Sequence, residues 1–279
     1  MSEVGQPILA AAGFQPASLI HMALAEDIGE GDVTTNACVP ADRQAKGIFV
    51  TREPLTLAGT TLLPEIYENI QLHHKDGETL PPGTKIATVQ GSARTLLERE
   101  RTALNFLQRL SGVATLAHAF AQKVAHTNCR ILDTRKTTPG LRRLEKAAAA
   151  SGGVTNHRMG LYDAILIKNN HIAAAGSVTK AIDNARTAGL PIEIEVRTPA
   201  ELNEALEAKA DHLLLDNLTP QQAKEWIALI DKRAKVELSG GITLETVQAY
   251  AETGADFVSV GAITHSARAV DISFRLELI

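Results

Sequence analysis

The chain has 279 residues, of which 44% are hydrophobic and 22% are charged, a composition typical of a folded globular protein with one large or two unequal domains. A formal net charge of −4 and an aromatic content of 4% argue against a protein that coats nucleic acid, and the lack of any apolar run of about 18 residues argues against a membrane-spanning helix. Two scattered cysteines, Cys38 and Cys129, and a beginning without a basic segment ahead of an apolar one favour a cytoplasmic protein over a secreted one.

The first third of the chain predicts a mixed α and β unit. Residues 16–27 have the pattern of a short helix, and residues 30–36 (EGDVTTN) have the composition of a turn. Between residues 44 and 90, short β-like runs surround one helical segment, LLPEIYEN. Residues 94–110 then form a strongly amphipathic pattern, so we expect Arg101 to lie along a stable helix and not at a frayed end.

After Cys129 the pattern changes to short apolar runs that alternate with helical segments. Six of these runs are candidate strands: 130–134, 164–168, 192–196, 212–216, 235–239 and 256–260. Their spacing settles to about 20–30 residues, which is typical of βα units and a parallel sheet. Thr198-Pro199 and Thr219-Pro220 each predict a helix that begins with a threonine cap followed by proline.

The length of this region predicts an incomplete α/β barrel. A complete barrel of eight units needs about 200 residues or more, and residues 130–265 are fewer, so we expect six or seven strands. A doubly wound sheet is the alternative, but no G-x-G-x-x-G motif follows any of the six runs.

Residues 130–168 carry eight basic side chains against three acidic ones, although the chain as a whole is negative. A local excess of this kind indicates a site for a multiply charged anion. A solvated helical face is the favoured interpretation for three of the basic residues, Arg142, Arg143 and Lys146. Three others lie at the edges of predicted elements: Arg135, Arg158 and Lys168.

Each of the six predicted strands ends in a polar residue or a glycine turn. These residues are Arg135, Lys136, Lys168, Glu195, Asp216, Ser239, Gly240, Gly241 and Gly261. In parallel α/β barrels the carboxyl ends of the strands converge on one mouth, where active sites are built. One charged residue at a strand end is usually just the strand reaching water, but six such ends in register compose a candidate site.

The run IEIEV (192–196) places Glu193 and Glu195 on the same side of a strand. If that side faces the barrel interior, both carboxylates are partly desolvated and need cations or a metal. Glu195, which lies nearer the mouth, is the better candidate for a ligand. We expect Glu193 to be a structural partner of a lysine.

Glycine turns follow the last two predicted strands, at residues 239–241 and at Gly261. Backbone N–H groups in such turns bind phosphate without any side-chain charge, so the turns favour a phosphate site. Asp216 is a candidate ligand for Mg²⁺, which takes one or two carboxylates and fills its shell with water and substrate phosphates.

Two other kinds of site are disfavoured. Three histidines lie in the same part of the sequence, but none has the spacing of zinc ligands: His157, His171 and His265. A serine nucleophile is poorly supported, because no G-x-S-x-G motif is present.

Eight segments, taken in order, carry a resemblance to a known family. They are ALAEDIGEGDVTT (23–35), ERTALNFLQRLSGVAT (100–115), LDTRKTTPGLR (132–142), GGVTNHRMGLYDAILIKNNHI (152–172), IEIEV (192–196), LLLDN (213–217), LSGGI (238–242) and VSVGAITHS (258–266). Over nearly its whole length the sequence resembles the quinolinate phosphoribosyltransferase family.

The resemblance implies a particular architecture. We expect an N-terminal α/β sandwich domain (1–112), an α/β barrel domain of about seven strands (113–266), and a C-terminal segment (267–279) that packs back on the first domain. The resemblance also implies a homodimer, which some family members extend to a hexamer, with Arg101 reaching the site from the partner subunit.

The resemblance implies roles for individual residues as well. The implied substrate-binding residues are Arg101, Thr134, Arg135, Lys136, His157, Arg158, Lys168, Glu195, Asp216, Ser239, Gly240, Gly241 and Gly261. Four of these are implied to be catalytic: Lys136, Lys168, Glu195 and Asp216. Glu195 and Asp216 are the implied ligands of Mg²⁺, the one cofactor expected.

The implied activity is transfer of the phosphoribosyl group of phosphoribosyl pyrophosphate to the ring nitrogen of quinolinate, with loss of the C2 carboxylate, in de novo NAD biosynthesis. Both substrates are polyanions, and guanidinium groups match carboxylates well, which explains the basic segment. Three alternatives stay open: a paralogue associated with molybdenum transport that acts on another acid, a phosphate-binding barrel isomerase of amino-acid biosynthesis, and a non-catalytic anion-binding protein.

Overall fold

A computed structural model describes residues 16–279 of the chain. They form two compact units: the first from residues 16–118, 143–153 and 267–279, the second from residues 119–142 and 154–266. The expectation about a leader segment, and the start of the predicted first domain, concern residues 1–15 and lie outside the described residues. No helix among the described residues is both long enough and apolar enough to cross a bilayer.

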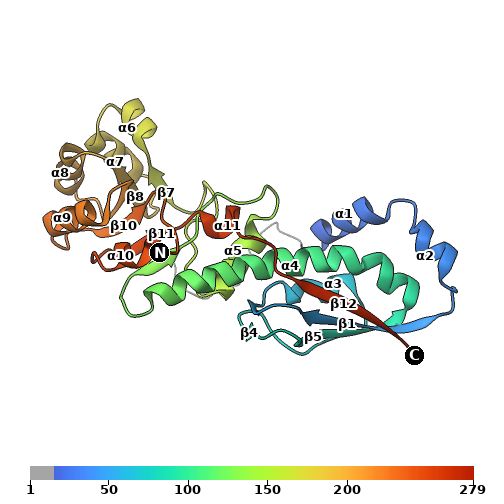
Figure 1. Cartoon of the computed structure of the whole chain (residues 1–279). Coiled ribbons are helices and arrows are strands. Elements are labelled where there is room, and N and C mark those ends of the chain that lie inside the picture. Colours follow the sequence, from blue (N-terminus) through green and yellow to red (C-terminus); the bar gives the residue numbers. More distant parts are fainter. Residues whose placement is uncertain (1–15) are drawn as a thin grey trace. The chain divides into compact units, whose positions relative to one another are not determined.

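The first unit is built on an antiparallel sheet of four strands in the order β12-β1-β5-β3. These strands are β1 (Gln44–Thr51), β3 (Ile70–Leu72), β5 (Lys85–Ser92) and β12 (Ile272–Leu278). The C-terminal strand β12, drawn in red in Figure 1, pairs with β1 from Ala45 opposite Leu278 to Thr51 opposite Ile272. A separate two-stranded sheet joins β2 (Leu55–Thr56) and β4 (Thr79–Leu80).

The helical elements that belong to this unit wholly or mainly are α1 (Pro16–Ile28), α2 (Val33–Cys38), the 3-10 turn η2 (Thr60–Leu62), α3 (Leu63–Ile66), α4 (Ala93–Val124) and α5 (Arg142–Ser151). Two predictions are corrected here. Residues 30–36 are not only a turn, because the Asp32 side chain accepts the Thr35 amide at 2.9 Å and so begins α2. The helix predicted over 94–110 continues to Val124, because buried apolar positions such as Val113 and Phe120 keep recurring along it.

The C-terminal segment of this unit is hydrogen-bonded to α4. The Val270 amide donates to the Gln108 carbonyl at 3.1 Å, and the Gln108 side chain donates to the Ile272 carbonyl at 2.8 Å. Gly112 allows this close approach, because a Cβ at that position would collide with the backbone carbonyl of Arg268 and lie 3.4 Å from the Ala269 Cα. A glycine inside a helix, normally unfavourable, is therefore required by the packing here.

Helix α5 is more buried than predicted. Positions 144–146, 148 and 149 are buried, so the predicted solvated face is wrong for Lys146, which is fully buried, whereas Arg142 and Arg143 are half-buried. Glu145 is also fully buried, and its Oε1 accepts from Arg109 Nε at 3.1 Å and Nη2 at 2.7 Å.

The second unit is built on six parallel strands in the order β6-β11-β10-β9-β8-β7. They are β6 (Arg130–Leu132), β7 (Ile165–Ile167), β8 (Ile192–Val196), β9 (His212–Asp216), β10 (Lys235–Ser239) and β11 (Phe257–Ser259). All six predicted strands are confirmed. Because β7 to β11 are adjacent in chain order without a reversal, the sheet is wound as a barrel and not doubly wound.

The barrel is incomplete, as predicted. Strands β6 and β7 stand at the two ends of the sheet order and do not pair within the described residues. A single parallel bridge between Leu132 and Thr155, on the far side of β6 from β11, takes the place of a seventh strand.

The helices of the second unit are α6 (Asn169–Ala175), α7 (Val178–Arg186), α8 (Pro199–Glu207), α9 (Pro220–Ile230), α10 (Val247–Ala251) and α11 (Ala262–His265). Helices α7 to α10 lie around the outside of the strands (Figure 1). The two predicted caps are confirmed, since the Thr198 side chain accepts the Glu201 amide and Thr219 forms a capping box with Gln222.

The close approach at Gly112 predicts that replacing this helical glycine with alanine lowers the stability of the protein, the opposite of the usual effect. Gly→Ala inside a helix normally stabilises by about 1 kcal/mol, but Gly112→Ala should destabilise by about 1–3 kcal/mol because the added Cβ meets backbone that cannot rotate away. Urea unfolding followed by circular dichroism measures the difference. Gly91→Ala is the matched control, since its Cβ would have no neighbour within 4 Å; equal stability of Gly112→Ala and the parent would contradict the packing described.

Candidate active site

Polar residues gather along the carboxyl-terminal edge of the parallel sheet. The strand order sets their sequence along this edge: Arg135 and Lys136 after β6, Gly261 after β11, residues 239–241 around the end of β10, Asp216 on β9, Glu195 on β8 and Lys168 after β7. Ser239 and Asp216 are direct neighbours across β10 and β9. The sheet thus brings to one edge residues that are more than a hundred positions apart in the chain.

Glu195 holds two cationic side chains at this edge. Its Oε2 accepts from Lys168 Nζ at 2.9 Å, and its Oε1 contacts the Arg197 guanidinium. The carboxylate is only 2% exposed, whereas the two cations are about half exposed. A buried carboxylate can therefore present two positive charges toward solvent or an anionic ligand.

The turn after β9 and the turn after β10 are built against each other. The Asn217 amide donates to the Ser239 carbonyl at 2.9 Å, and the Asn217 side chain donates to Asp216 Oδ2 at 2.7 Å. Gly240 has a φ of +108°, and a Cβ there would lie 2.8 Å from the Asn217 amide nitrogen. Only glycine fits this position, because Asn217 occupies the space that a Cβ would need.

Lys136 and the Gly261 turn also meet at this edge. The Thr264 hydroxyl donates to the Lys136 carbonyl at 2.7 Å. A Cβ at Gly261 would lie 3.1 Å from Lys136 Cδ and 3.2 Å from the His265 ring. Thr134 supports the same loop, since its hydroxyl accepts the Lys136 amide at 3.1 Å.

Two guanidinium groups lie near each other in a partly buried position. Burial lowers the pKa of Arg158, and the positive charge of Arg135 lowers it further. Arg158 Nη1 donates to the Ala164 carbonyl at 3.0 Å. Arg135 Nε is buried and has no hydrogen-bond partner among the described residues. Two neighbouring cations with an unpaired donor form a site that an anion would complete.

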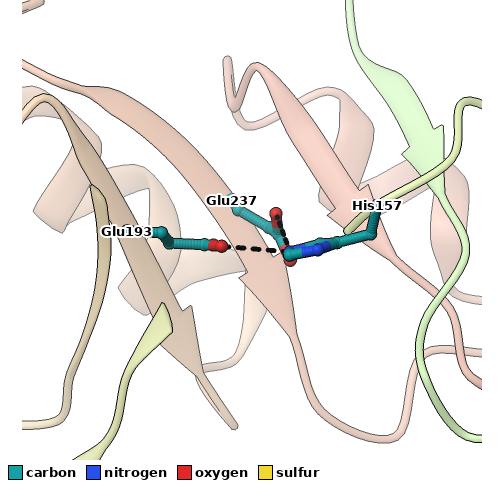
Figure 2. Close-up of side chains that lie close together, drawn as sticks. All are labelled: His157, Glu193 and Glu237. Carbon is teal, nitrogen blue, oxygen red and sulfur yellow. Dashed lines mark hydrogen bonds and ion pairs between the residues drawn. The ribbon is translucent and has the colours of Figure 1, made fainter. Parts of the chain in front are cut away.

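His157 is held in place by a buried carboxylate. Asp133, which follows β6 and is fully buried, accepts the His157 amide at 2.8 Å and the Asn156 side chain at 2.5 Å. The tip of the His157 ring then approaches Glu193 on β8 and Glu237 on β10, as Figure 2 shows. Its Nε2 lies 3.0 Å from Glu193 Oε2 and 3.5 Å from Glu237 Oε2.

These interior groups change one another's ionisation. Burial lowers the pKa of His157, but the hydrogen bond to Glu193 and the carboxylate of Glu237 outweigh burial and raise it above its ordinary value. Burial raises the pKa of Glu237 to about 7. The prediction that Glu193 pairs with a lysine is wrong: its partners are the imidazole rings of His157 and His212, because both histidines lie on the same interior side.

The other predicted residues lie as follows. Arg101 is exposed on α4, in the first unit. His171 accepts the Lys168 amide at the start of α6, at 2.9 Å, and His265 contacts the Ser266 hydroxyl at 2.6 Å. Among the described residues, the cluster able to hold a metal ion contains His157 together with Glu193 and Glu237, and neither of the other two histidines.

Comparison with known proteins places the chain in a family. Its sequence matches the family models "Quinolinate phosphoribosyl transferase, C-terminal domain" over residues 113–275 and "Quinolinate phosphoribosyl transferase, N-terminal domain" over residues 32–111. The chain belongs to the quinolinate phosphoribosyltransferase family. The fold agrees with that assignment. The resemblance inferred from the eight sequence segments is therefore confirmed.

Relatives in this family align over almost the full chain. The probable nicotinate-nucleotide pyrophosphorylase [carboxylating] of Bacillus subtilis is 42% identical, with 93% of both chains covered. The corresponding protein of Mycobacterium leprae is also 42% identical, over 92% of this chain and 95% of its own. The solved nicotinate-nucleotide pyrophosphorylase of Francisella tularensis has a TM-score of 0.91 at 36% identity and covers 98% of this chain and 100% of its own.

Four residues in or beside the candidate site were not identified from the sequence: Asp133, Arg197, His212 and Glu237. Asp133 and Arg197 lie next to strand ends, so their positions were a usable signal. Nothing in the spacing of His212 and Glu237 could have revealed them, because they meet their partners across strands.

Proposed function

We propose that this chain transfers the phosphoribosyl group of phosphoribosyl pyrophosphate to the ring nitrogen of quinolinate, with release of diphosphate and of the C2 carboxylate as CO₂. The product is nicotinate mononucleotide, so the enzyme is a pentosyltransferase of de novo NAD biosynthesis. The observation that carries this proposal is the pair Arg135 and Arg158, two neighbouring guanidiniums with an unpaired buried donor, in a chain of this family.

The electrostatics of the two substrates call for such a site. Quinolinate has two adjacent carboxylates, and phosphoribosyl pyrophosphate carries a phosphomonoester of about −1.5 to −2 charge and a diphosphate. The two molecules repel each other, so the ring nitrogen reaches C1 of the ribose only where fixed cations offset both. Arg135 and Arg158 suit the dicarboxylate, because a guanidinium binds a carboxylate through two parallel hydrogen bonds.

The backbone turns suit the 5′-phosphate. Residues 239–241 and the Gly261 turn lie after neighbouring strands β10 and β11, and their amides can approach an anion closely because glycine has no Cβ. Phosphate sites after the last strands are frequent in α/β barrels. The neighbouring Lys136 adds a positive charge that backbone amides do not supply.

Asp216 is the residue that best suits Mg²⁺. Its carboxylate is half-buried, lies beside the 239–241 turn and accepts one hydrogen bond from Asn217, and Mg²⁺ prefers one or two carboxylates with substrate phosphates. Both Glu195 oxygens contact cations instead, so Glu195 as a metal ligand stays a prediction. When bound, Mg²⁺ would neutralise the diphosphate and stabilise charge on the leaving group.

The remaining chemistry follows from position and charge. As diphosphate leaves C1, the ribose gains oxocarbenium character and the ring nitrogen of quinolinate forms the new bond. The alkylated nitrogen is cationic and accepts the electron pair left at C2 when CO₂ departs. A proton then replaces the carboxylate at C2. Lys136 and Lys168 are the proposed groups that orient the reacting anions, and no covalent nucleophile is required.

One assay tests the proposed function against its alternatives. Quinolinate and phosphoribosyl pyrophosphate are incubated with the protein and Mg²⁺, and CO₂ and nicotinate mononucleotide are followed together. We expect both products in equal amounts. A barrel isomerase or a simple anion-binding protein would form neither, and a paralogue would act on a different acid, so absence of both products from folded protein would refute the proposal.

The arginine pair gives a quantitative prediction. Arg135→Ala and Arg158→Ala should each raise the quinolinate dissociation constant by a factor of about ten to several hundred, since a charge-assisted hydrogen bond is worth about 1.5–3 kcal/mol. Isothermal titration calorimetry measures the change. Arg233→Ala is the matched control, because within residues 16–279 that side chain donates to the Ile230 and Leu229 carbonyls at the end of α9. Unchanged affinity in both site variants would remove them from the pocket.

We also propose that the active form is a homodimer, which can assemble into a hexamer, with Arg101 entering the partner subunit's site. Arg101 is exposed on the long helix α4, where a partner can reach it. Mixing inactive Arg101→Ala with inactive Lys168→Ala subunits should then restore part of the activity, because a mixed dimer keeps one intact site. No recovery despite verified subunit exchange would contradict a shared site.

We also propose that the domain boundaries lie at residues 112 and 266. We further propose that the protein is cytoplasmic. Both cysteines are free thiols, Cys38 exposed and Cys129 buried, which suits a reducing compartment.

A further inference from the structure

Three buried side-chain atoms inside the barrel lack hydrogen-bond partners among the described residues, and they come from three neighbouring strands. They are Glu193 Oε1 on β8, His212 Nε2 on β9 and Glu237 Oε2 on β10; none has a hydrogen-bond partner among the described residues. The Glu193 side chain is 7% exposed and the Glu237 side chain 2%. Buried polar atoms are almost always satisfied, so three orphans in one place call for a missing occupant.

The spacing of these atoms suits a metal ion. His212 Nε2 lies 3.8 Å from Glu193 Oε1 and 3.8 Å from Glu237 Oε2, which is too long for direct hydrogen bonds. Two ligand atoms that each lie about 2.1 Å from a shared ion are roughly 3.4 to 4.2 Å apart as their angle opens from tetrahedral to linear. Both observed distances fall inside this window.

His157 completes the surroundings without being a ligand. The Arg158 amide donates to His157 Nδ1 at 2.7 Å, so this nitrogen must offer a lone pair and the ring carries its proton on Nε2. That proton is donated to Glu193 Oε2. Ser259 donates in the same way to Glu237 Oε1, at 2.5 Å. Each carboxylate thus has one oxygen fixed by a hydrogen bond, while its other oxygen lies 3.8 Å from His212 Nε2. Of these two other oxygens, Glu237 Oε2 also lies 3.5 Å from His157 Nε2.

Two carboxylates, Glu193 and Glu237, share this buried position. The His157 ring contacts both of them through one nitrogen and supplies at most one positive charge. Ionised carboxylates in a low-dielectric interior need a counter-charge, and one divalent cation supplies it for both.

A cavity reaches this position. It has a volume of about 640 Å³ and is lined by Glu193, His157 and His212, by residues at the amino-terminal ends of strands, such as Ile165 and Lys235, and by Arg158. His212 and Asp216 begin and end the same strand, four residues or roughly 13 Å apart. The cavity therefore extends from the amino-terminal ends of the strands, opposite Asp216, to Arg158, one of the two arginines of the candidate active site.

We propose that Glu193, His212 and Glu237 form a binding site for a divalent transition-metal ion in the barrel interior. The ligand set of two carboxylates and one imidazole suits Zn²⁺, Mn²⁺ or Fe²⁺, whereas Mg²⁺ has little affinity for imidazole. The ion links β8, β9 and β10 and balances their buried charge. The site stands on its own geometry and does not rest on the proposed activity.

The test uses the full-length protein, stripped with EDTA and free of substrates. Zn²⁺ binding is measured by equilibrium dialysis in the presence of excess Mg²⁺, which occupies sites that hold only oxygen ligands. We expect one Zn²⁺ per chain. His212→Ala and Glu237→Gln should each raise the Zn²⁺ dissociation constant at least tenfold, with circular dichroism showing that the variants are folded; if one variant fails to fold, the other carries the comparison.

Two controls separate this site from others. His126→Ala removes a surface histidine of the same unit, which contacts Glu252 and is about half exposed, and should leave Zn²⁺ binding unchanged. Asp216→Asn should also leave it unchanged, because Asp216 belongs to the active-site edge. Loss of Zn²⁺ in either control with retention in His212→Ala would overturn the proposal.

A crystal soaked in Zn²⁺ gives an independent readout. Anomalous diffraction at the zinc edge should show a peak within about 2.0–2.2 Å of all three ligand atoms. A peak elsewhere, or an ordered water molecule in its place, would overturn the proposal. Neither outcome bears on phosphoribosyl transfer, so failure here and failure of the proposed function are distinguishable.

Discussion

Repulsion between like charges shapes the second unit of this protein. The positive charge of Arg135 lowers the pKa of the neighbouring Arg158, and Arg135 Nε is buried without a hydrogen-bond partner among the described residues. A fold tolerates such an arrangement where a ligand removes the repulsion. The parallel sheet makes the arrangement possible, because every strand delivers its last residue to the same edge.

The barrel interior has the opposite charge. Glu193, Glu195 and Glu237 are buried there, and the side chains that face them decide what each can do. Glu195, near the edge, is matched by Lys168 and Arg197 and so presents cations to a ligand. Glu193 and Glu237, deeper in the barrel, face histidines whose geometry leaves acceptor oxygens unpaired. One strand, β8, therefore contributes to two sites of different chemistry.

The sequence predicted the parts of this structure that depend on local patterns. Six apolar runs became six strands, and Thr198 and Thr219 became helix caps, because burial and capping act within a few residues. The extent of α4 and the capping of α2 by Asp32 were missed, since each depends on packing or a side-chain bond that composition does not reveal. Among site residues, strand ends were visible in the sequence. His212 and Glu237 were not, because they meet their partners only when strands whose paired residues are 19 or more positions apart in the chain are placed side by side.

The central claim is that Arg135 and Arg158 together neutralise the two carboxylates of one small acid. The most direct measurement is a crystal structure of the protein soaked with quinolinate. We expect electron density for the pyridine ring with its carboxylates hydrogen-bonded to both guanidinium groups, and with Arg135 Nε no longer unpaired. Quinolinate bound elsewhere on the protein, with the two arginines contacting only protein or water, would contradict the account.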